Sequence, residues 1–277
     1  MNILEFSGLV GMGALLAGFL GALTGLGGGV VIVPLLTIAL GVDIRYAIGA
    51  SLVSVIATSS GAAAAYVREG FTNLRVGMLL EIATTLGAIV GASLTTVLPG
   101  QVIAVIFGVV LLHSAYVATR QLEDHAAGSP DRLATWLRLA GSYPTEDGPR
   151  TYQVRRVPLG AALMGLAGVL SGLLGIGSGA VKVLAMDRAM QLPFKVSTTT
   201  SNFMIGVTAA AGAGIYLRRG YIDPGLAMPV MLGVLVGSLL GARVLTAARP
   251  RGLRLVFAIV IALLGAEMIF NGLAGRL

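Results

Sequence analysis

The chain of 277 residues contains no cysteine, which excludes disulfides, thiolate metal sites and cysteine catalysis. Charged residues make up only 11% of it, whereas a soluble domain of this length carries about twice that share. With two histidines and no clustered carboxylates, the chain lacks the ligands of a metalloenzyme and the residues of an intramembrane protease. We therefore expect no enzymatic activity, no metal and no cofactor.

The residues that are present are mostly small and apolar. Hydrophobic residues make up 56% of the chain, aromatic residues only 6%, and 40 residues are glycine, with a mean hydropathy of +0.91. This composition is typical of tightly packed membrane helices, in which small residues let backbones approach closely. It excludes a soluble enzyme and a disordered chain. The net charge of +7 could suggest a nucleic-acid-binding protein. In a membrane protein, however, what matters is where each charge lies relative to the bilayer.

Long runs without a charged residue predict an all-α polytopic membrane protein, because a helix needs about 20 apolar residues to cross a bilayer. Breaks rich in glycine or proline divide the longest runs. We expect ten helical segments, at 7–24, 28–41, 45–67, 75–97, 101–119, 158–174, 178–191, 195–217, 224–247 and 253–272. The two short segments, 28–41 and 178–191, either cross fully or are re-entrant.

A hydrophilic stretch, 121–156, interrupts the apolar sequence with ten charged residues and several glycines and prolines. It divides the chain into a first membrane repeat, 1–120, and a second, 157–277, and we expect it to be a cytoplasmic linker. Three apolar residues of the linker share one helical face, which predicts a short helix on the membrane surface: Leu133, Trp136 and Leu137.

The two halves are related by an internal repeat with a constant offset of 150 residues. Gly25-Leu-Gly-Gly-Gly29 falls on Gly175-Ile-Gly-Ser-Gly179, and Tyr66-Val-Arg-Glu-Gly-Phe71 falls on Tyr216-Leu-Arg-Arg-Gly-Tyr221. Chance similarity between apolar helices would not keep one register across loops, so we interpret the chain as a duplicated unit. Five segments per copy is an odd number, which predicts two inverted repeats with a short broken helix in each.

The basic residues favour this inverted arrangement over a parallel one. With the linker in the cytoplasm and all ten segments crossing, 14 Lys and Arg residues lie inside and 4 outside. Re-entrant short segments would make the copies parallel and give 11 inside against 7 outside. Because cytoplasmic loops carry the Lys and Arg excess, we expect a cytoplasmic linker and both termini outside.

The paired glycine motifs are the first candidate binding site. Each opens a segment too short to cross alone, at matching positions of two inverted halves, which is typical of a transporter's binding site. Free backbone N–H groups at such a break suit a small anion. Helix packing is the alternative, and we favour packing for the ladder of Gly233, Gly237 and Gly241. The candidate substrate-binding residues are Gly27, Gly28, Gly29, Gly177, Ser178 and Gly179.

Lys182 is the one strong charge deep inside an apolar segment, and its repeat partner is Ile32. An intramembrane lysine is a functional hypothesis by default, and here it would supply a fixed positive charge for an anion. The alternative is a lysine that extends to the interface or pairs with a carboxylate such as Glu267 or Glu81.

Hydroxyl-rich stretches beside the glycine motifs add substrate-binding candidates: Ser51, Ser201 and Asn202. Hydrogen bonding within their own helix or to neighbouring helices is the alternative for these residues. Carboxylates and histidines relay protons in transporters. The candidates for proton coupling are therefore Glu81, His113 and Glu267, although a lone histidine is more often a packing residue.

Gly25-Leu-Gly-Gly-Gly-Val-Val-Ile-Val-Pro34, followed by Ala47-Ile-Gly-Ala-Ser-Leu52 and Gly70-Phe71, resembles the sulfite exporter TauE/SafE family of bacterial membrane permeases. Gly175-Ile-Gly-Ser-Gly179 and Thr200-Ser201-Asn202 look like the second copy of that pattern. The resemblance covers nearly the whole chain except the linker, and the second copy departs from it at Leu174, Lys182 and Asn202. It implies a multi-pass protein of the bacterial cytoplasmic membrane that exports sulfite or another small sulfur-containing anion.

We therefore expect a secondary transporter that exports a small anion, such as sulfite, sulfoacetate or sulfolactate, by alternating access coupled to the proton gradient. An anion channel, which would lack substrate saturation, is the alternative, and a structural membrane protein is a weaker one. The expected partners are the anion and the lipid bilayer, without nucleic acid; a homodimer is left open.

Overall fold

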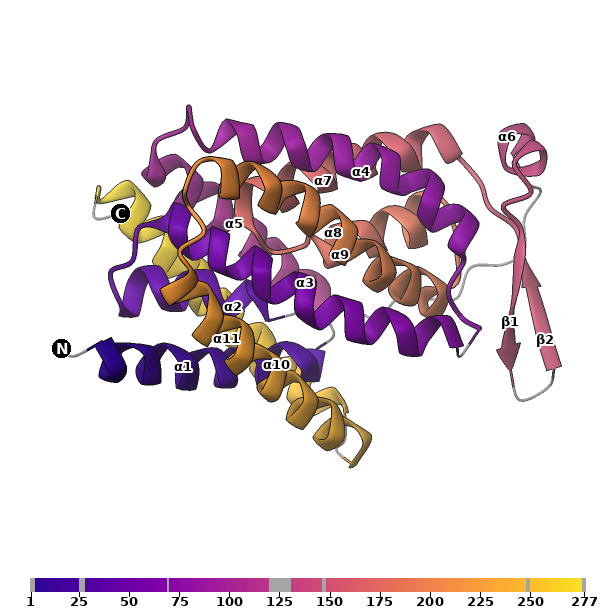
Figure 1. Cartoon of the computed structure of the whole chain (residues 1–277). Coiled ribbons are helices and arrows are strands. Elements are labelled where there is room, and N and C mark those ends of the chain that lie inside the picture. Colours follow the sequence, from indigo (N-terminus) through magenta and orange to yellow (C-terminus); the bar gives the residue numbers. More distant parts are fainter. Residues whose placement is uncertain are drawn as a thin grey trace.

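The computed structural model describes residues 3–24, 28–68, 70–119, 131–145, 148–247 and 250–275. Helices make up most of it, and the described strands form a single antiparallel hairpin at one end of the molecule (Figure 1). This confirms the all-α fold class.

The two halves contain the same elements in the same order, offset by 150 residues. The first half consists of α1 (Ile3–Thr24), α2 (Gly29–Pro34), the π-helical turn η1 (Leu35–Ala39), α3 (Ile44–Arg68), α4 (Leu74–Leu94) and α5 (Gly100–Thr119). The second half consists of α7 (Val157–Leu174), α8 (Gly179–Leu184), η2 (Ala185–Ala189), α9 (Phe194–Arg218), α10 (Pro224–Ala247) and α11 (Pro250–Leu273). All ten predicted segments are helical, with ends that differ by at most four residues.

Both short segments end in a π-helical turn at the same repeat position. Each runs for eleven residues, six of α-helix and five of π-helix, or about 16 Å at 1.5 Å per residue. Pro34 lacks an N–H group and ends α2, but Leu184 at the equivalent position precedes the same wide turn, so proline is not its cause. The segments are too short to cross a bilayer alone.

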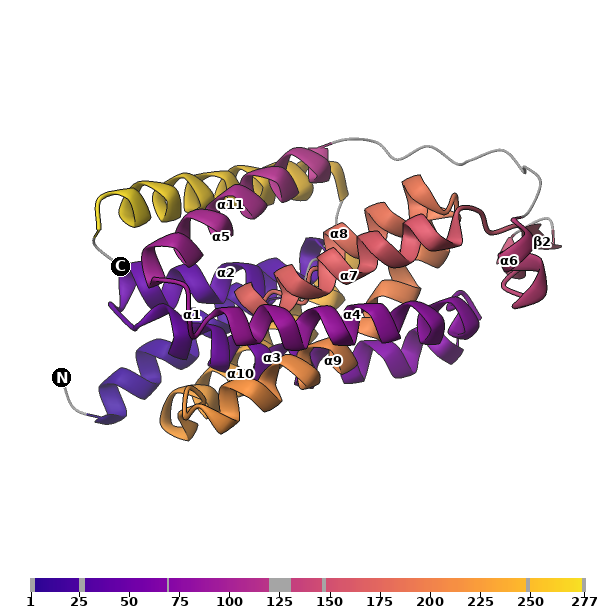
Figure 2. The ribbon, with the colours of Figure 1, turned by 90° about the horizontal axis from the view of Figure 1, so that it is seen from above.

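The halves interlock instead of forming two separate bundles. Helix α1 packs along α10, and α4 packs along α7. The repeat relates these two pairs to each other, because α7 corresponds to α1 and α10 corresponds to α4. Helix α3 packs on α9 and α5 on α11, so each of these pairs joins equivalent helices of the two copies (Figure 2). The orientation of the two copies relative to a bilayer stays a prediction.

Glycines allow the closest of these helix contacts. A Cβ atom on Gly168 of α7 would overlap the carbonyl oxygen of Thr84 in α4. On α10, Gly237 faces the Leu15 carbonyl oxygen of α1 in the same way, and Gly233 faces the same helix. The interpretation of Gly233 and Gly237 as packing residues is thus confirmed.

The described part of the linker contains α6 (Arg132–Trp136) and the strands β1 (Gly141–Thr145) and β2 (Gly148–Tyr152). Helix α6 lies where a short helix was predicted, and its Trp136 side chain is 77% exposed. The hairpin was not predicted. Its register pairs Pro144 with Pro149, and because proline is rare in strands, the composition gave no strand signal.

The linker docks on the loops that precede α4 and α9. Asn73 donates hydrogen bonds from its side chain to the Leu139 carbonyl oxygen and the Tyr152 hydroxyl, at 2.9 and 2.8 Å. The Arg155 guanidinium donates to the side-chain oxygen of Gln191 at 3.0 Å. These loops and the linker therefore lie at one end of the molecule, while the first and last described residues lie at the other (Figure 1).

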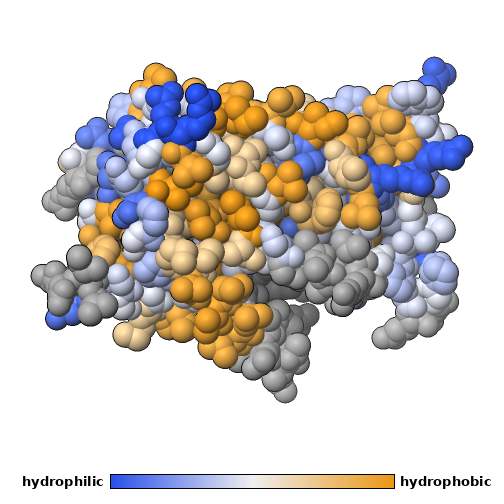
Figure 3. All heavy atoms as spheres, in the orientation of Figure 1, coloured by the Kyte–Doolittle hydropathy of each residue, from blue (hydrophilic) through white to orange (hydrophobic). Residues whose placement is uncertain are grey.

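The surface agrees with a membrane protein. Figure 3 shows hydrophobic residues across the middle of one face, with hydrophilic residues gathered toward the two ends. Four described helical stretches are long and apolar enough to cross a bilayer: Leu74–Leu94, Gly100–Val117, Val157–Leu174 and Pro224–Gly241. Shorter apolar stretches lie in α1, α2 with η1, α3 and α11.

Candidate functional site

Lys182 lies at the centre of a polar cluster between α4, α8 and α9. Its side chain is fully buried, with 0% exposure, and its Nζ atom donates a hydrogen bond to Thr208 Oγ1 at 2.6 Å. Thr208 Oγ1 lies 2.7 Å from Glu81 Oε1, to which it can donate in turn. The structure thus joins the buried cation to Glu81 through one hydroxyl group.

Glu81 is the counter-charge of this cluster. It extends from the second turn of α4, is 9% exposed, and its Oε1 atom also accepts a hydrogen bond from Thr85 at 3.2 Å. Its other oxygen, Oε2, is buried and has no hydrogen-bond partner among the described residues. Removing one member of a buried charge pair leaves the other uncompensated, so the two charges depend on each other.

The Thr208 hydroxyl has two hydrogen-bond acceptors within reach. It has a single proton, and both Glu81 Oε1 at 2.7 Å and the Met204 carbonyl oxygen at 2.9 Å are within reach. Donation to Met204 would release Glu81 without moving a helix. The bridge between the charges can therefore open and close by rotation of one hydroxyl.

The repeat shows that the fold does not require these charges. An offset of 150 residues places Ile32 at the position of Lys182 and Met231 at the position of Glu81. Ile32 is fully buried, as Lys182 is, and α10 packs on α3 as α4 packs on α9. The equivalent set of helices, α2, α3 and α10, thus forms the same arrangement with apolar side chains at both positions.

The two glycine motifs meet in the interior. A Cβ atom on Gly29 would lie 2.7 Å from Ser51 Oγ and 3.1 Å from the carbonyl oxygen of Gly175. Ser51 Oγ donates a hydrogen bond to that same carbonyl oxygen at 2.8 Å. Glycine at position 29 thus lets the start of α2 approach the end of α7, and the Ser51 hydroxyl holds them together.

The second motif follows a left-handed path. Gly175, Gly177 and Ser178 have φ angles of +68°, +69° and +48°, a region that glycine adopts readily and serine rarely. Ser201 Oγ donates to the Gly179 carbonyl oxygen at 3.3 Å. The Ser178 hydroxyl is buried and has no hydrogen-bond partner among the described residues, so it remains able to bind a ligand.

The structure brings most of the predicted substrate-binding residues together but separates the proton-coupling candidates. Gly28 lies beside Gly29, Asn202 beside Ser201 is half-buried, and Gly27 lies outside the described residues. His113 on α5 and Glu267 on α11 have exposed side chains, whereas Glu81 is buried. Of the two carboxylates considered as partners for Lys182, the structure selects Glu81. Thr208 belongs to the hydroxyl-rich stretch of the second copy, but it was not among the predicted substrate-binding residues, because no signal distinguishes it from the other hydroxyls of that stretch.

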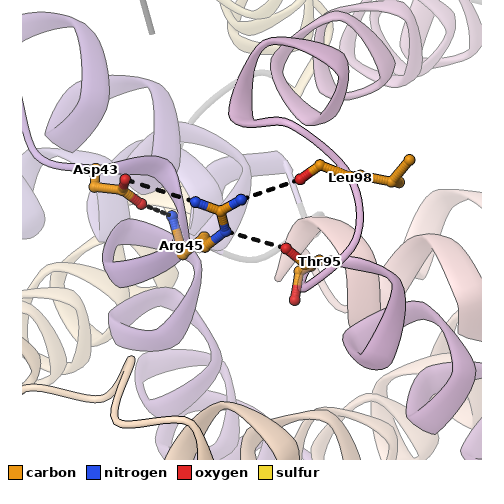
Figure 4. A network of polar contacts seen from close by, with 4 residues as sticks. All are labelled: Asp43, Arg45, Thr95 and Leu98. Atoms are coloured by element: carbon orange, nitrogen blue, oxygen red, sulfur yellow. Dashed lines mark hydrogen bonds and ion pairs between the residues drawn. The ribbon is translucent and has the colours of Figure 1, made fainter.

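A second polar network surrounds Arg45 (Figure 4), at the start of α3 and at the end of the molecule opposite the linker (Figure 1). Arg45 donates hydrogen bonds from Nε to the Thr95 carbonyl oxygen at 3.0 Å and from Nη2 to that of Leu98 at 3.1 Å. Its Nη1 atom lies 3.9 Å from Asp43 Oδ2. This network ties the start of α3 to the turn between α4 and α5.

A cavity of about 380 Å³ is lined by Ser93, Ile215, Arg218 and Arg219. Tyr46, next to Arg45 in α3, packs edge-on against Tyr221, which follows these arginines, with ring centroids 5.6 Å apart. Arg45, Arg218 and Arg219, which the inverted arrangement places outside, therefore lie at the same end. Among the described residues, no group of three or more His, Asp and Glu side chains could hold a metal ion.

Comparison with known proteins indicates a membrane transporter. The chain is similar to the probable membrane transporter protein YunE of Bacillus subtilis (strain 168), with 28% identity over 94% of this chain and 96% of YunE. YdhB of the same organism, also a probable membrane transporter protein, is 27% identical over 83% of this chain and 84% of YdhB. The probable membrane transporter protein MJ0441 of Methanocaldococcus jannaschii is 24% identical over 92% of both chains.

No solved structure matches the chain. The sequence profile of the family described as sulfite exporter TauE/SafE matches residues 10–268, which is nearly the whole chain. The buried polar cluster, the paired glycine turns and the apolar helices therefore belong to a membrane transporter. The chain is a member of the sulfite exporter TauE/SafE family.

Proposed function

We propose that the protein is a secondary transporter that exports a small oxyanion, sulfite or an organosulfonate, by alternating access coupled to protons. The observation that carries this proposal is the fully buried Lys182, connected through Thr208 to Glu81. Intramembrane charges are rare and mark substrate and proton pathways. Since Ile32 and Met231 occupy the equivalent positions in the other set of packed helices, a structural need does not account for the pair.

The glycine turns supply uncharged donors for the same anion. The contact between Gly29 and Gly175 places the two turns against each other, and the buried Ser178 hydroxyl adds a donor. Within a bilayer these groups must be satisfied by protein, by water in a cavity or by a ligand. A small oxyanion has several acceptor oxygens and would satisfy more than one of them.

Alternating access fits the two networks at opposite ends. Arg45 joins α3 to the turn between α4 and α5 at one end, and Asn73 joins α4 to the linker at the other. The interlocked helix pairs would let one set of helices rock against the other around the site.

Flux through the purified protein in proteoliposomes tests this function. Sulfite, sulfoacetate and sulfolactate are offered separately, and at least one is expected to enter with saturable kinetics. Unsaturable flux would instead indicate an anion channel, and absence of flux for all three would contradict the proposal. Lys182→Met should weaken the affinity by about 1–3 kcal/mol if the lysine contacts the anion directly.

A matched pair of glycine variants tests the turn. Gly177 has φ +69°, and a Cβ atom there would lie 2.9 Å from the Ile205 side chain, so Gly177→Ala should impair transport. Gly214→Ala is the control, because a Cβ atom on Gly214 meets no atom within 4 Å. Equal transport by the two variants would place the site elsewhere.

A further inference from the structure

We infer that the anion and one proton cross the membrane together, with the anion bound at Lys182 and the proton on Glu81. This inference rests on the proposed function and specifies its coupling as symport. It depends on the distances that join Lys182, Thr208 and Glu81, on the burial of all three, and on the unpartnered Oε2 atom of Glu81.

Without substrate the cluster contains one positive and one negative charge that share a single hydroxyl group. The elements around Glu81 supply no second counter-charge within the described part of the chain. Helix α7 has no ionisable residue, and the charges of α9, Lys195 and Arg218, lie at its ends. On η2, Asp187 and Arg188 lie beyond α8 and contact each other at 3.7 Å. Lys182 is therefore the cation on which Glu81 depends.

An anion that binds Lys182 takes over the role of its counter-charge. Glu81 would then be left as a buried carboxylate without compensation, which is strongly unfavourable in a low-dielectric interior. Uptake of a proton from the adjoining water forms an O–H bond at Oε2 and restores neutrality. The unpartnered Oε2 atom is free to accept that proton, because Oε1 alone makes the hydrogen bonds to Thr208 and Thr85.

Release reverses these steps on the other side of the membrane. The anion leaves Lys182, the O–H bond of Glu81 breaks, the proton passes to water, and the bridge through Thr208 forms again. A proton on Glu81 and an anion on Lys182 thus favour each other, which is the condition for symport; antiport requires that they exclude each other. Export of an acid made in the cytoplasm would carry out the anion together with a proton, and a monovalent anion would move without net charge.

Anion binding and protonation of Glu81 affect each other by the same factor, so the direction in which pH changes anion affinity tests the inference. If the anion promotes protonation of Glu81, protonation must increase anion affinity by the same factor. For one proton per anion, the affinity of the wild type should rise by up to about tenfold for each unit that pH falls in the range where Glu81 titrates. Glu81→Gln is permanently neutral, so it should bind the anion at least as tightly as the wild type and with a flat pH profile.

The experiment uses proteoliposomes with a pH-sensitive dye in the lumen and sulfoacetate as the probe, because its sulfonate group stays ionised near neutral pH. An inward sulfoacetate gradient should acidify the lumen of wild-type vesicles. Glu81→Gln should retain exchange of internal for external sulfoacetate but no longer acidify the lumen. Asp223→Asn is the matched control and should behave as the wild type, because it removes an exposed carboxylate and keeps the oxygen that accepts a hydrogen bond from the Gly225 N–H group. Protein-free vesicles correct for leak, and sulfite or sulfolactate replaces sulfoacetate if the wild type transports only that anion.

Failure of the proposed function and failure of symport alone give different results. A wild type that moves none of the three anions overturns the proposed function and this inference with it. A wild type that moves the anion without acidifying the lumen, or makes the lumen alkaline, overturns symport alone, as does continued acidification by Glu81→Gln. If Glu81→Gln does not fold, the wild type alone tests the coupling through the pH dependence of its anion affinity. An affinity that does not rise as pH falls would overturn the inference.

Discussion

At the scale of single residues, the two sets of packed helices that the repeat relates carry different side chains at two equivalent positions. Lys182 and Glu81 in one set of packed helices correspond to Ile32 and Met231 in the other. Both sets form the same helix contacts, so the charged pair is a local replacement within a duplicated frame. Because only one of the two equivalent helix sets carries this pair, the molecule is consistent with a single anion site and not with two equivalent ones.

This asymmetry predicts a non-additive pair of substitutions. Lys182→Ile and Glu81→Met should each lower stability, by about 3–5 kcal/mol, because each leaves one buried charge without its partner. The double variant copies the apolar residues of the equivalent helix set, Ile32 and Met231, and should be about as stable as the wild type. Thermal unfolding in detergent of the four proteins measures the coupling. Additive losses would show that the two charges do not interact.

At the scale of the elements, the contact between α4 and α7 positions Glu81. Gly168 of α7 lies against the Thr84 carbonyl oxygen, within the same turn of α4 as Glu81. A change in this helix contact therefore displaces the carboxylate.

A pair of glycine variants on α7 tests this contact. Gly168→Ala should force the helices apart, lower stability by about 1–3 kcal/mol and reduce transport. Gly165→Ala, one turn earlier, should be neutral or slightly stabilising, because its Cβ would lie 3.9 Å from the nearest atom, the Ala83 carbonyl oxygen. Thermal unfolding and flux are measured for both variants. If Gly168→Ala behaves like Gly165→Ala, the helix contact is looser than the structure indicates.

The docking of the linker on α4 depends on Asn73, whose side chain also accepts a hydrogen bond from the Val76 N–H group at the start of that helix. Asn73→Asp retains this acceptor and loses the donors to Leu139 and Tyr152, whereas Asn73→Ala loses both functions. Limited proteolysis of the linker should accelerate in both variants, while stability should fall, by about 1 kcal/mol, mainly in the alanine variant. Equal cleavage rates in the two variants and the wild type would contradict docking through Asn73.

The docking of the linker through Asn73 can also be followed by titration of Tyr152. Burial raises the pKa of the Tyr152 phenol. The hydrogen bond from Asn73 acts in the opposite direction and lowers this pKa, but burial is the larger cause. Undocking removes both, so in Asn73→Ala, which adds no charge, Tyr152 should ionise at lower pH than in the wild type. Ultraviolet difference titration measures this shift.

At the scale of the whole molecule, the described part of the linker lies at one end, and the first and last described residues lie at the other (Figure 1). The absence of cysteine allows single cysteines to be introduced without a background. A cysteine at Asp131 should be protected from an impermeant thiol reagent in intact cells, and one at Gly275 should be labelled, because the Lys and Arg excess predicts a cytoplasmic linker. The reverse pattern would invert the topology, and equal labelling would reject the inverted arrangement.

The sequence by itself determined the helical segments, the short broken pair and the offset of 150 residues between the copies. These features are local: a charge-free run of sufficient length forms a helix in a bilayer, and glycine breaks it. The sequence also identified Lys182 as the unusual charge, because an intramembrane lysine stands out without any knowledge of its neighbours.

Only the tertiary structure decided which groups meet. It selected Glu81 over Glu267 as the partner of Lys182, inserted Thr208 between them, placed Gly29 against Gly175, and interlocked the two halves. Apolar residues lie on all sides of these helices, so hydrophobic periodicity does not show which face turns toward which neighbour. That choice depends on where glycines allow two backbones to approach, which is a property of pairs of helices and not of either sequence alone.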